Sequence, residues 1–263
     1  MLTAFGEDDC GFLAGGVAYQ LFFAIIPVLA LVIGIFGLIY GPQRATVELG
    51  TIVQRTIPAL RDEEARIVRS LVDGRAVSFG LGLAGTLLSA SAIYGSLDTA
   101  LSGVFGRTGR RRYVRGQLEA MLFLLAIAGL AVASFAASFG IQAAQDLAES
   151  SGSVGRWLLF LTSPLVGLVP GIAFFFLVFR LVPRKRLTPR VALRGALVSA
   201  VLWEAAKLAF AVLTRALGTF AAYGALAFAA GLLTWIYVTA AIVLIGAEFI
   251  KTEGEPGVKG APA

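Results

Sequence analysis

Long runs without a single charged residue are the strongest constraint on how this chain can fold. Five runs of 34, 22, 26, 23 and 32 residues contain no Asp, Glu, Lys or Arg, and they are Cys10 to Gln43, Ala76 to Leu97, Ala120 to Gln145, Trp157 to Phe179 and Ala216 to Ala247. A helix needs about 20 apolar residues to cross the hydrocarbon core of a bilayer. All five runs are long enough, so the sequence predicts an all-α, polytopic membrane protein.

A sixth apolar stretch, from Gly195 to Thr214, carries two charges, Glu204 and Lys207. Each charge costs about 2.5 to 3.5 kcal/mol at the centre of a membrane helix. Such a helix inserts poorly alone, so we expect its neighbours to hold it with the charged face toward the interior of the bundle. One membrane domain with six spans is therefore predicted, with the spans at about 14–40, 76–97, 120–145, 157–179, 195–214 and 224–247.

Two segments outside the predicted spans carry structural predictions of their own. Residues 41–75 are polar, and within them Ile67, Val68, Leu71 and Val72 recur at helical spacing among charged residues. This pattern is typical of an amphipathic helix, which can rest on the membrane surface or pack on the protein, and both alternatives stay open. We expect amphipathic helices in this first extracytoplasmic loop and a flexible C-terminal tail over 249–263.

The distribution of basic residues predicts the topology. The connections after the second and fourth spans hold five and six Lys or Arg, whereas those after the third and fifth hold one each. Short basic loops stay in the cytoplasm. The first loop is an exception, with six Arg against five acids, and we keep it outside. The chain is therefore expected in the bacterial cytoplasmic (inner) membrane, with both termini in the cytoplasm.

Several function classes are excluded by composition. A chain with one Cys and no His cannot form an internal disulfide, and it lacks the most common general base and metal ligand. Zinc hydrolysis and Ser-His-Asp catalysis are thereby nearly ruled out, and no phosphate-binding loop of the P-loop kind is present. We expect no enzyme activity, no cofactor and no metal. In so apolar a chain, the net charge of +6 reports membrane topology rather than nucleic-acid binding.

Ionisable residues at membrane depth are functional candidates by default. Glu204 and Lys207 are three residues apart, so they share a helix face and can pair. The pair is then either a self-neutralised structural element or the polar lining of a substrate or proton path. Tyr19 and Tyr223 are assigned to the same candidate intramembrane site, although tyrosines near bilayer boundaries also serve as interface anchors.

A second candidate site is a cytoplasmic latch. Glu248 ends the last predicted span, where its carboxylate opposes the helix dipole unless a basic group meets it. Asp98 lies at the cytoplasmic end of the second span and has the same choice of partners. Arg180, Arg184 and Arg194 of the basic loop are the expected partners, so we predict a latch formed by Glu248, Asp98, Arg184 and Arg194.

Short motifs in a fixed order connect this chain with a known family. They are Ala18-Tyr19-Gln20-Leu21 leading to Pro27, Leu181-Val182-Pro183, Gly195-Ala196 followed by Trp203-Glu204 and Lys207, Tyr223-Gly224, and Gly246-Ala247-Glu248. On these motifs the chain resembles the YihY/BrkB family of bacterial inner-membrane proteins, from about Ala14 to Glu248. Ser102 stands where that family leads us to expect Asn, which leaves any role of that polar side chain in doubt.

The resemblance implies an integral envelope protein without a settled activity. Members were once labelled ribonuclease BN, but nuclease chemistry fits badly with a chain that has no histidine and no cluster of metal-binding carboxylates. We expect a transporter or lipid translocase that moves an envelope lipid or small solute past a polar intramembrane site; the alternative is a structural or scaffolding membrane protein. The expected partners are membrane lipids, with anionic headgroups at the basic loops, but not nucleic acid, and a homo-oligomer stays open.

Overall fold

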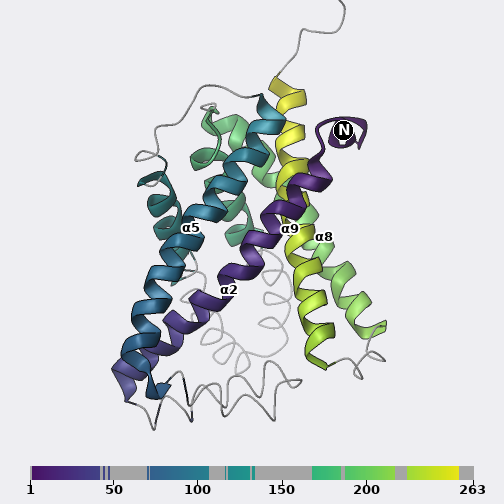
Figure 1. The fold of residues 1–263 in the computed structure, drawn as a ribbon. Coiled ribbons are helices and arrows are strands. Elements are labelled where there is room, and N and C mark those ends of the chain that lie inside the picture. The colour runs from purple at the N-terminus through teal and green to yellow at the C-terminus, as the bar shows by residue number, and fades with distance from the viewer. Residues whose placement is uncertain are drawn as a thin grey trace, which may run out of the picture. The chain divides into compact units, whose positions relative to one another are not determined.

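The structure is a computed structural model, and the part of the chain that it describes is helical with no strand. It describes residues 2–41, 44, 47, 70, 72–106, 116, 118–130, 132–133, 168–184, 187–216 and 224–254. The helices are α1 (Leu2–Glu7), α2 (Cys10–Tyr40), α5 (Arg75–Phe105), α8 (Pro189–Ala216) and α9 (Gly224–Gly254), of which the four long ones are labelled in Figure 1. Two shorter apolar helices cover Leu118–Leu130 and Leu168–Leu181.

Within the residues that the structure describes, four helices are long and apolar enough to cross a membrane. The candidate spans are Cys10–Tyr40, Ala76–Phe105, Pro189–Val212 and Leu226–Glu253. The prediction of an all-α, polytopic membrane protein is confirmed at this level. About half of the third and fourth predicted spans and most of 41–75 lie outside the described residues, so six spans and amphipathic loop helices remain predictions.

The long helices continue past the charges that limited the predicted spans. Helix α5 ends at Phe105 rather than at Leu97, and α9 ends at Gly254 rather than at Ala247. Backbone hydrogen bonding continues through a charged residue when that side chain finds a partner, so the first charge after an apolar run does not mark the helix end. The first residues of the predicted C-terminal tail, up to Gly254, are therefore helical.

Helix α8 also begins before its predicted span, at Pro189. Proline fits the first position of a helix because its missing N–H would have no helical acceptor there. The carbonyl of Thr188 accepts a hydrogen bond of 3.0 Å from the N–H of Ala192. The local sequence Thr-Pro thus starts the helix before the apolar stretch begins.

Two compact units make up the chain. Unit 1 comprises Met1–Ala14, Leu97–Ala209 and Thr239–Ala263, and unit 2 comprises Gly15–Ser96 and Phe210–Val238. All of the ionic contacts considered below belong to unit 1.

In unit 2, α2 and α5 pack so closely that glycine is required. A Cβ added to Gly34 would lie 2.7 Å from the backbone nitrogen of Phe79, and one added to Gly85 would lie 2.7 Å from the Cβ of Pro27. A Cβ on Gly82 would collide with the backbone of Leu31. Along this contact the residue numbers on α2 decrease while those on α5 increase, so the two helices run antiparallel. Small residues permit this close approach in a membrane, where packing rather than the hydrophobic effect drives helix association.

In unit 1, α8 and α9 are in similarly close contact. A Cβ on Gly246 would collide with Oγ of Ser199 and lie 2.8 Å from Cζ of Phe179. The hydroxyl of Ser199 donates to the carbonyl of Ile242 over 3.4 Å. The side chain of Phe179 is fully buried, so the helix Leu168–Leu181 contributes to the same packed core. This contact fixes α9 one turn before its charged residues.

Candidate functional site

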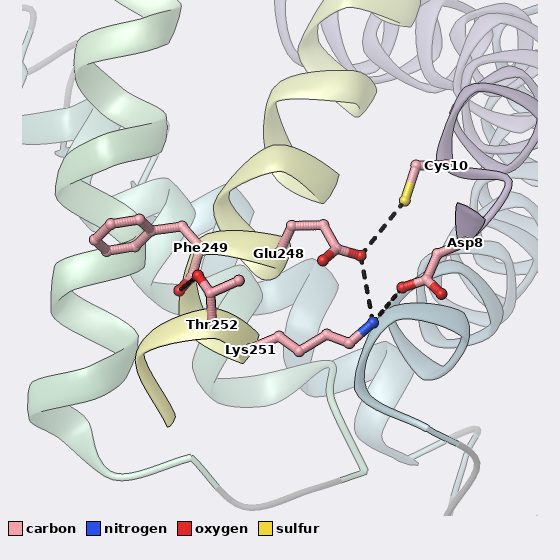
Figure 2. Close-up of polar contacts among 6 residues, drawn as sticks. All are labelled: Asp8, Cys10, Glu248, Phe249, Lys251 and Thr252. Atoms are coloured by element: carbon pink, nitrogen blue, oxygen red, sulfur yellow. Dashed lines mark hydrogen bonds and ion pairs between the residues drawn. The ribbon is translucent and has the colours of Figure 1, made fainter. Parts of the chain in front are cut away.

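A polar cluster in unit 1 joins the last turns of α9 to the turn between α1 and α2. Figure 2 shows Glu248 and Lys251 reaching from α9 toward Asp8 and Cys10. Glu248 and Lys251 are three residues apart, which places them on the same helix face. Thr252 is not part of the cluster, because its hydroxyl donates to the carbonyl of Phe249 at 2.9 Å.

The turn between α1 and α2 explains how Asp8 and Cys10 reach this position. Asp9 has a φ of 50°, in the left-handed region that Asp and Asn tolerate better than most residues. Its N–H donates to the carbonyl of Gly6 at 3.3 Å and ends α1, while its own carbonyl accepts from the N–H of Leu13 at 3.0 Å in the first turn of α2. The reversal leaves the side chains on either side of Asp9 free to face α9.

One ammonium group faces two carboxyl groups in the cluster. The ammonium of Lys251 forms a short ion pair with Oδ2 of Asp8 and lies 3.7 Å from Oε1 of Glu248. The thiol of Cys10 donates to the same oxygen of Glu248 over 4.0 Å. The second oxygen of Glu248, Oε2, has no hydrogen-bond partner within the part of the chain that the structure describes. Glu248 is 1% exposed, so this is a buried carboxyl group with incomplete pairing.

Asp8 lies at the outer edge of this cluster, before the first candidate span. The nearby carboxyl group of Glu248, and then the ammonium of Lys251, lower the pKa of the Asp8 carboxyl, against the smaller opposing effect of burial. Asp8 therefore stays ionised down to a lower pH than an ordinary aspartate does. The ionised carboxylate of Asp8 therefore places a negative charge beside the ammonium of Lys251.

Two of the four predicted latch residues contact each other. Arg184 donates from Nε to both carboxylate oxygens of Asp98, at 3.1 and 3.0 Å, and from Nη2 to Oδ2 at 2.6 Å. The neighbouring Arg180 donates to the carbonyl of Leu187 at 2.8 Å. The guanidinium of Arg184 thus ties α5 to the segment that follows helix Leu168–Leu181.

The other two latch residues have different partners from those predicted. The contacts that the structure gives Glu248 go to Asp8, Cys10 and Lys251, and among the described residues no arginine pairs with it. Arg194 pairs instead with Glu253, one helical turn further along α9, at 3.3 Å in an exposed position. The prediction of an arginine partner overlooked Lys251, which lies on the same face of the same helix as Glu248.

The two charges of the predicted intramembrane site contact each other. Nζ of Lys207 lies 2.7 Å from Oε1 of Glu204, and the two side chains are 34% and 33% exposed. Nζ of Lys207 also lies 4.5 Å from the ring centroid of Trp203, a distance at which a cation interacts favourably with an indole. The ring of Trp203 in turn meets that of Phe175 edge-on, with centroids 6.4 Å apart.

Neither of the two tyrosines assigned to that site belongs to the described part of unit 1. Tyr19 belongs to unit 2, where its exposed ring lies 4.6 Å from that of Phe23. Tyr223 lies outside the described residues. For metals, the searched part of the chain contains no group of three or more His, Cys, Asp or Glu that could hold an ion.

Four apolar helices of membrane-spanning length within the described part of the chain, with ion pairs such as Asp98 with Arg184 and Glu204 with Lys207, define a polytopic helical membrane protein. The chain matches the family described as "Virulence factor BrkB" over residues 1–258. It therefore belongs to this family, the YihY/BrkB family, and the resemblance seen in its motifs is confirmed.

Curated relatives agree with this assignment. The chain is 30% identical over 251 residues to a "UPF0761 membrane protein" of Chlorobium chlorochromatii, covering 92% of this chain and 56% of the relative. It is 31% identical to a protein of the same description from Alkalilimnicola ehrlichii, over 94% of this chain and 56% of the relative. It is 32% identical to "UPF0761 membrane protein YihY" of Salmonella newport, over 76% of this chain and 67% of the relative.

The chain spans about half the length of the first two of these relatives, at 56% of each. No solved structure matches it. The printed descriptions of the relatives state that they are membrane proteins and name no activity. Any activity of this chain must be argued from its own residues.

Proposed function

We propose that this protein is a transporter or lipid translocase, which moves an envelope lipid or a small solute past polar groups held at membrane depth. The observation that carries the proposal is the ion pair of Glu204 and Lys207 inside the candidate span Pro189–Val212. Charged residues in membrane helices are costly, and they characteristically mark substrate or ion pathways.

The exposure of this pair favours a functional role. Complete burial would remove the hydration of both charges, which can cost more than their attraction gains, and would leave no access for a ligand. About a third of each side chain is exposed instead, at 33% for Glu204 and 34% for Lys207. A substrate with an anionic group can displace the carboxylate and pair with Lys207, while a cationic group can pair with Glu204. The pair would then exchange partners as a charged headgroup passes.

A second candidate function, a scaffolding membrane protein, has its own supporting observation. Lys207 pairs with Glu204 and lies over the ring of Trp203, so the ammonium is satisfied entirely by residues of its own helix. A pair of this kind can fix the rotation of α8 in the bundle without contacting a substrate. The two functions differ in whether removal of the charges changes transport or only stability.

Transport can be tested in proteoliposomes that contain fluorescently labelled phospholipids. The rate at which the label crosses the bilayer is compared for wild type, Glu204→Gln and Lys207→Met, with Glu253→Gln as the matched control. Glu253 also forms an ion pair, with Arg194, but in an exposed position at the end of α9. We expect the first two variants to lose most of the transport rate and the control to keep it. If lipid and small solutes both fail to move in wild type, or if all variants match it, the scaffold is the better description.

We also propose an inner-membrane location, with both termini in the cytoplasm and with anionic lipid headgroups bound at the basic loops. The excess of Lys and Arg in the connections after the second and fourth predicted spans supports this orientation. A fused reporter that is active only in the cytoplasm should be active after Gly254 and inactive when inserted after Arg156. The opposite pattern contradicts the orientation.

A further inference from the structure

Glu248 is the most deeply buried carboxyl group of the polar cluster. It is 1% exposed, and its Oε1 receives the thiol hydrogen bond of Cys10 at 4.0 Å and lies 3.7 Å from the ammonium of Lys251. Both distances are long for contacts of their type, the first for a hydrogen bond from a thiol and the second for an ion pair. Its Oε2 has no hydrogen-bond partner in the described ranges. A buried carboxylate held this loosely is costly unless a proton neutralises it.

The number of charges in the cluster also favours a protonated Glu248. Asp8 and Glu248 are two carboxyl groups, Lys251 is one ammonium, and Cys10 contributes a thiol. The ammonium lies in short contact with Asp8 and at a longer distance from Glu248. With Glu248 protonated, the charges of Asp8 and Lys251 balance. With Glu248 ionised, one ammonium has to serve two carboxylates, one of them buried.

We propose that Glu248 is a proton-binding site, and that loss of its proton to water releases the N-terminal segment, α1 and the turn at Asp8, from α9. Ionisation places a negative charge next to the carboxylate of Asp8, which belongs to that segment. The described titratable groups that face Glu248 are Asp8, Cys10 and Lys251. Asp9, on the same turn, adds a further negative charge near Cys10. The repulsion therefore acts between the segment and α9, and no transported substrate is needed for it.

Infrared spectroscopy can test the proton site directly in the full chain. A protonated carboxyl group has a carbonyl stretch that disappears on ionisation. We expect one such band to titrate in wild type and in Glu253→Gln, and to be missing from Glu248→Gln. In Asp8→Asn the band should disappear at a pH lower by about one unit or more, because a negative neighbour is lost, and in Lys251→Gln at a higher pH for the opposite reason. The last two variants also test the site if Glu248→Gln fails to fold.

Cys10 reports on the release of the segment, because it is the only cysteine of the chain and is buried against Glu248. Dividing its rate of alkylation by a maleimide by that of the unfolded chain at the same pH removes the pH dependence of an ordinary accessible thiol. An ionised Glu248 disfavours a thiolate beside it, so a rise in this ratio indicates increased access. We expect this ratio to rise several-fold in wild type across the pH range where the infrared band disappears, and to stay low in Glu248→Gln, where the amide mimics the protonated acid.

Two results overturn the proposal. One is an infrared band that is unchanged in Glu248→Gln and insensitive to Asp8→Asn and Lys251→Gln, which shows that no proton binds at Glu248. The other is a Cys10 labelling ratio that does not depend on pH, or that changes equally in wild type and Glu248→Gln, which shows that the proton does not control the N-terminal segment. Failure of the lipid transport assay affects neither measurement.

Discussion

Replacing Arg184 with Gln should destabilise the protein by about 2 to 4 kcal/mol. Removing one partner of a buried ion pair costs about 3 to 5 kcal/mol, because the remaining charge is left buried, whereas an exposed pair contributes about 1 kcal/mol or less. The side chain of Asp98 is 8% exposed and that of Arg184 is 26% exposed, which places this pair closer to the buried limit. The expected loss in the free energy of unfolding is therefore that of a buried ion pair, reduced because Arg184 is partly hydrated.

The two partners should not be equivalent. Arg184→Gln removes the guanidinium that pairs with the buried carboxylate of Asp98, but Asp98→Asn leaves a guanidinium that already reaches solvent. We expect the aspartate variant to cost only about 1 to 2 kcal/mol. Arg184→Lys keeps the charge but loses the forked donors that contact both oxygens of Asp98, so its cost should fall between the two.

The free energy of unfolding can be measured in mixed micelles by titration with a denaturing detergent. Arg194→Gln is the matched control, because it breaks the exposed pair with Glu253 and should change stability by about 0.5 kcal/mol or less. The double variant Asp98→Asn/Arg184→Gln should lose less than the sum of the single variants. The reasoning is refuted if Arg184→Gln costs no more than Arg194→Gln, or no more than Asp98→Asn.

Two further predictions concern packing and pH. Gly246→Ala should destabilise the protein by about 1 to 3 kcal/mol, because the new methyl group would lie 2.8 Å from Phe179. The control is Gly231→Ala on the same helix, whose methyl group meets nothing within 4 Å and which should be neutral or slightly stabilising. Equal effects of the two variants on thermal unfolding would contradict the close contact at Gly246. The lowered pKa of Asp8 means that its contribution to stability is present above its ordinary value of 3.8 and is lost as pH falls through the lowered value. The stability of Asp8→Asn should therefore depend less on acid pH than that of wild type, and identical profiles would show that Lys251 does not hold the carboxylate.

Local spacing predicted one of the contacts that lie within a helix, the pair of Glu204 and Lys207. Glu204 and Lys207 are three residues apart, and this spacing alone places the two charges within reach of each other, as the structure finds at 2.7 Å. The contact of Asp98 with Arg184 could also be anticipated, because both follow apolar runs that were expected to end on the same side of the membrane. Apolar runs and the placement of arginines carry this information without any knowledge of packing.

The same reasoning could not find the partners of Glu248. Lys251 was overlooked because the helix was expected to end at Ala247, although a basic residue three positions after a buried acid is a usable signal. Asp8 and Lys251 are separated by 243 positions, and no periodicity links residues that far apart. Helix ends and long-range contacts depend on which side chains meet in the folded chain. The positions of charged residues in the sequence do not predict those meetings.

The difference between the two acids bears on what each can do. The partner of Glu204 lies on the same helix. A change in the charge of Glu204 therefore acts within α8 and on any group that contacts this face of α8. The partners of Glu248 come from α9 and from the turn after α1, so a change in its charge acts between two elements that can separate. A pair within one helix suits the recognition of a charged substrate, and a cluster between elements suits a conformational response. Glu204→Gln and Glu248→Gln should therefore be separable, the first changing transport with the labelling of Cys10 unaltered, and the second changing the pH dependence of that labelling.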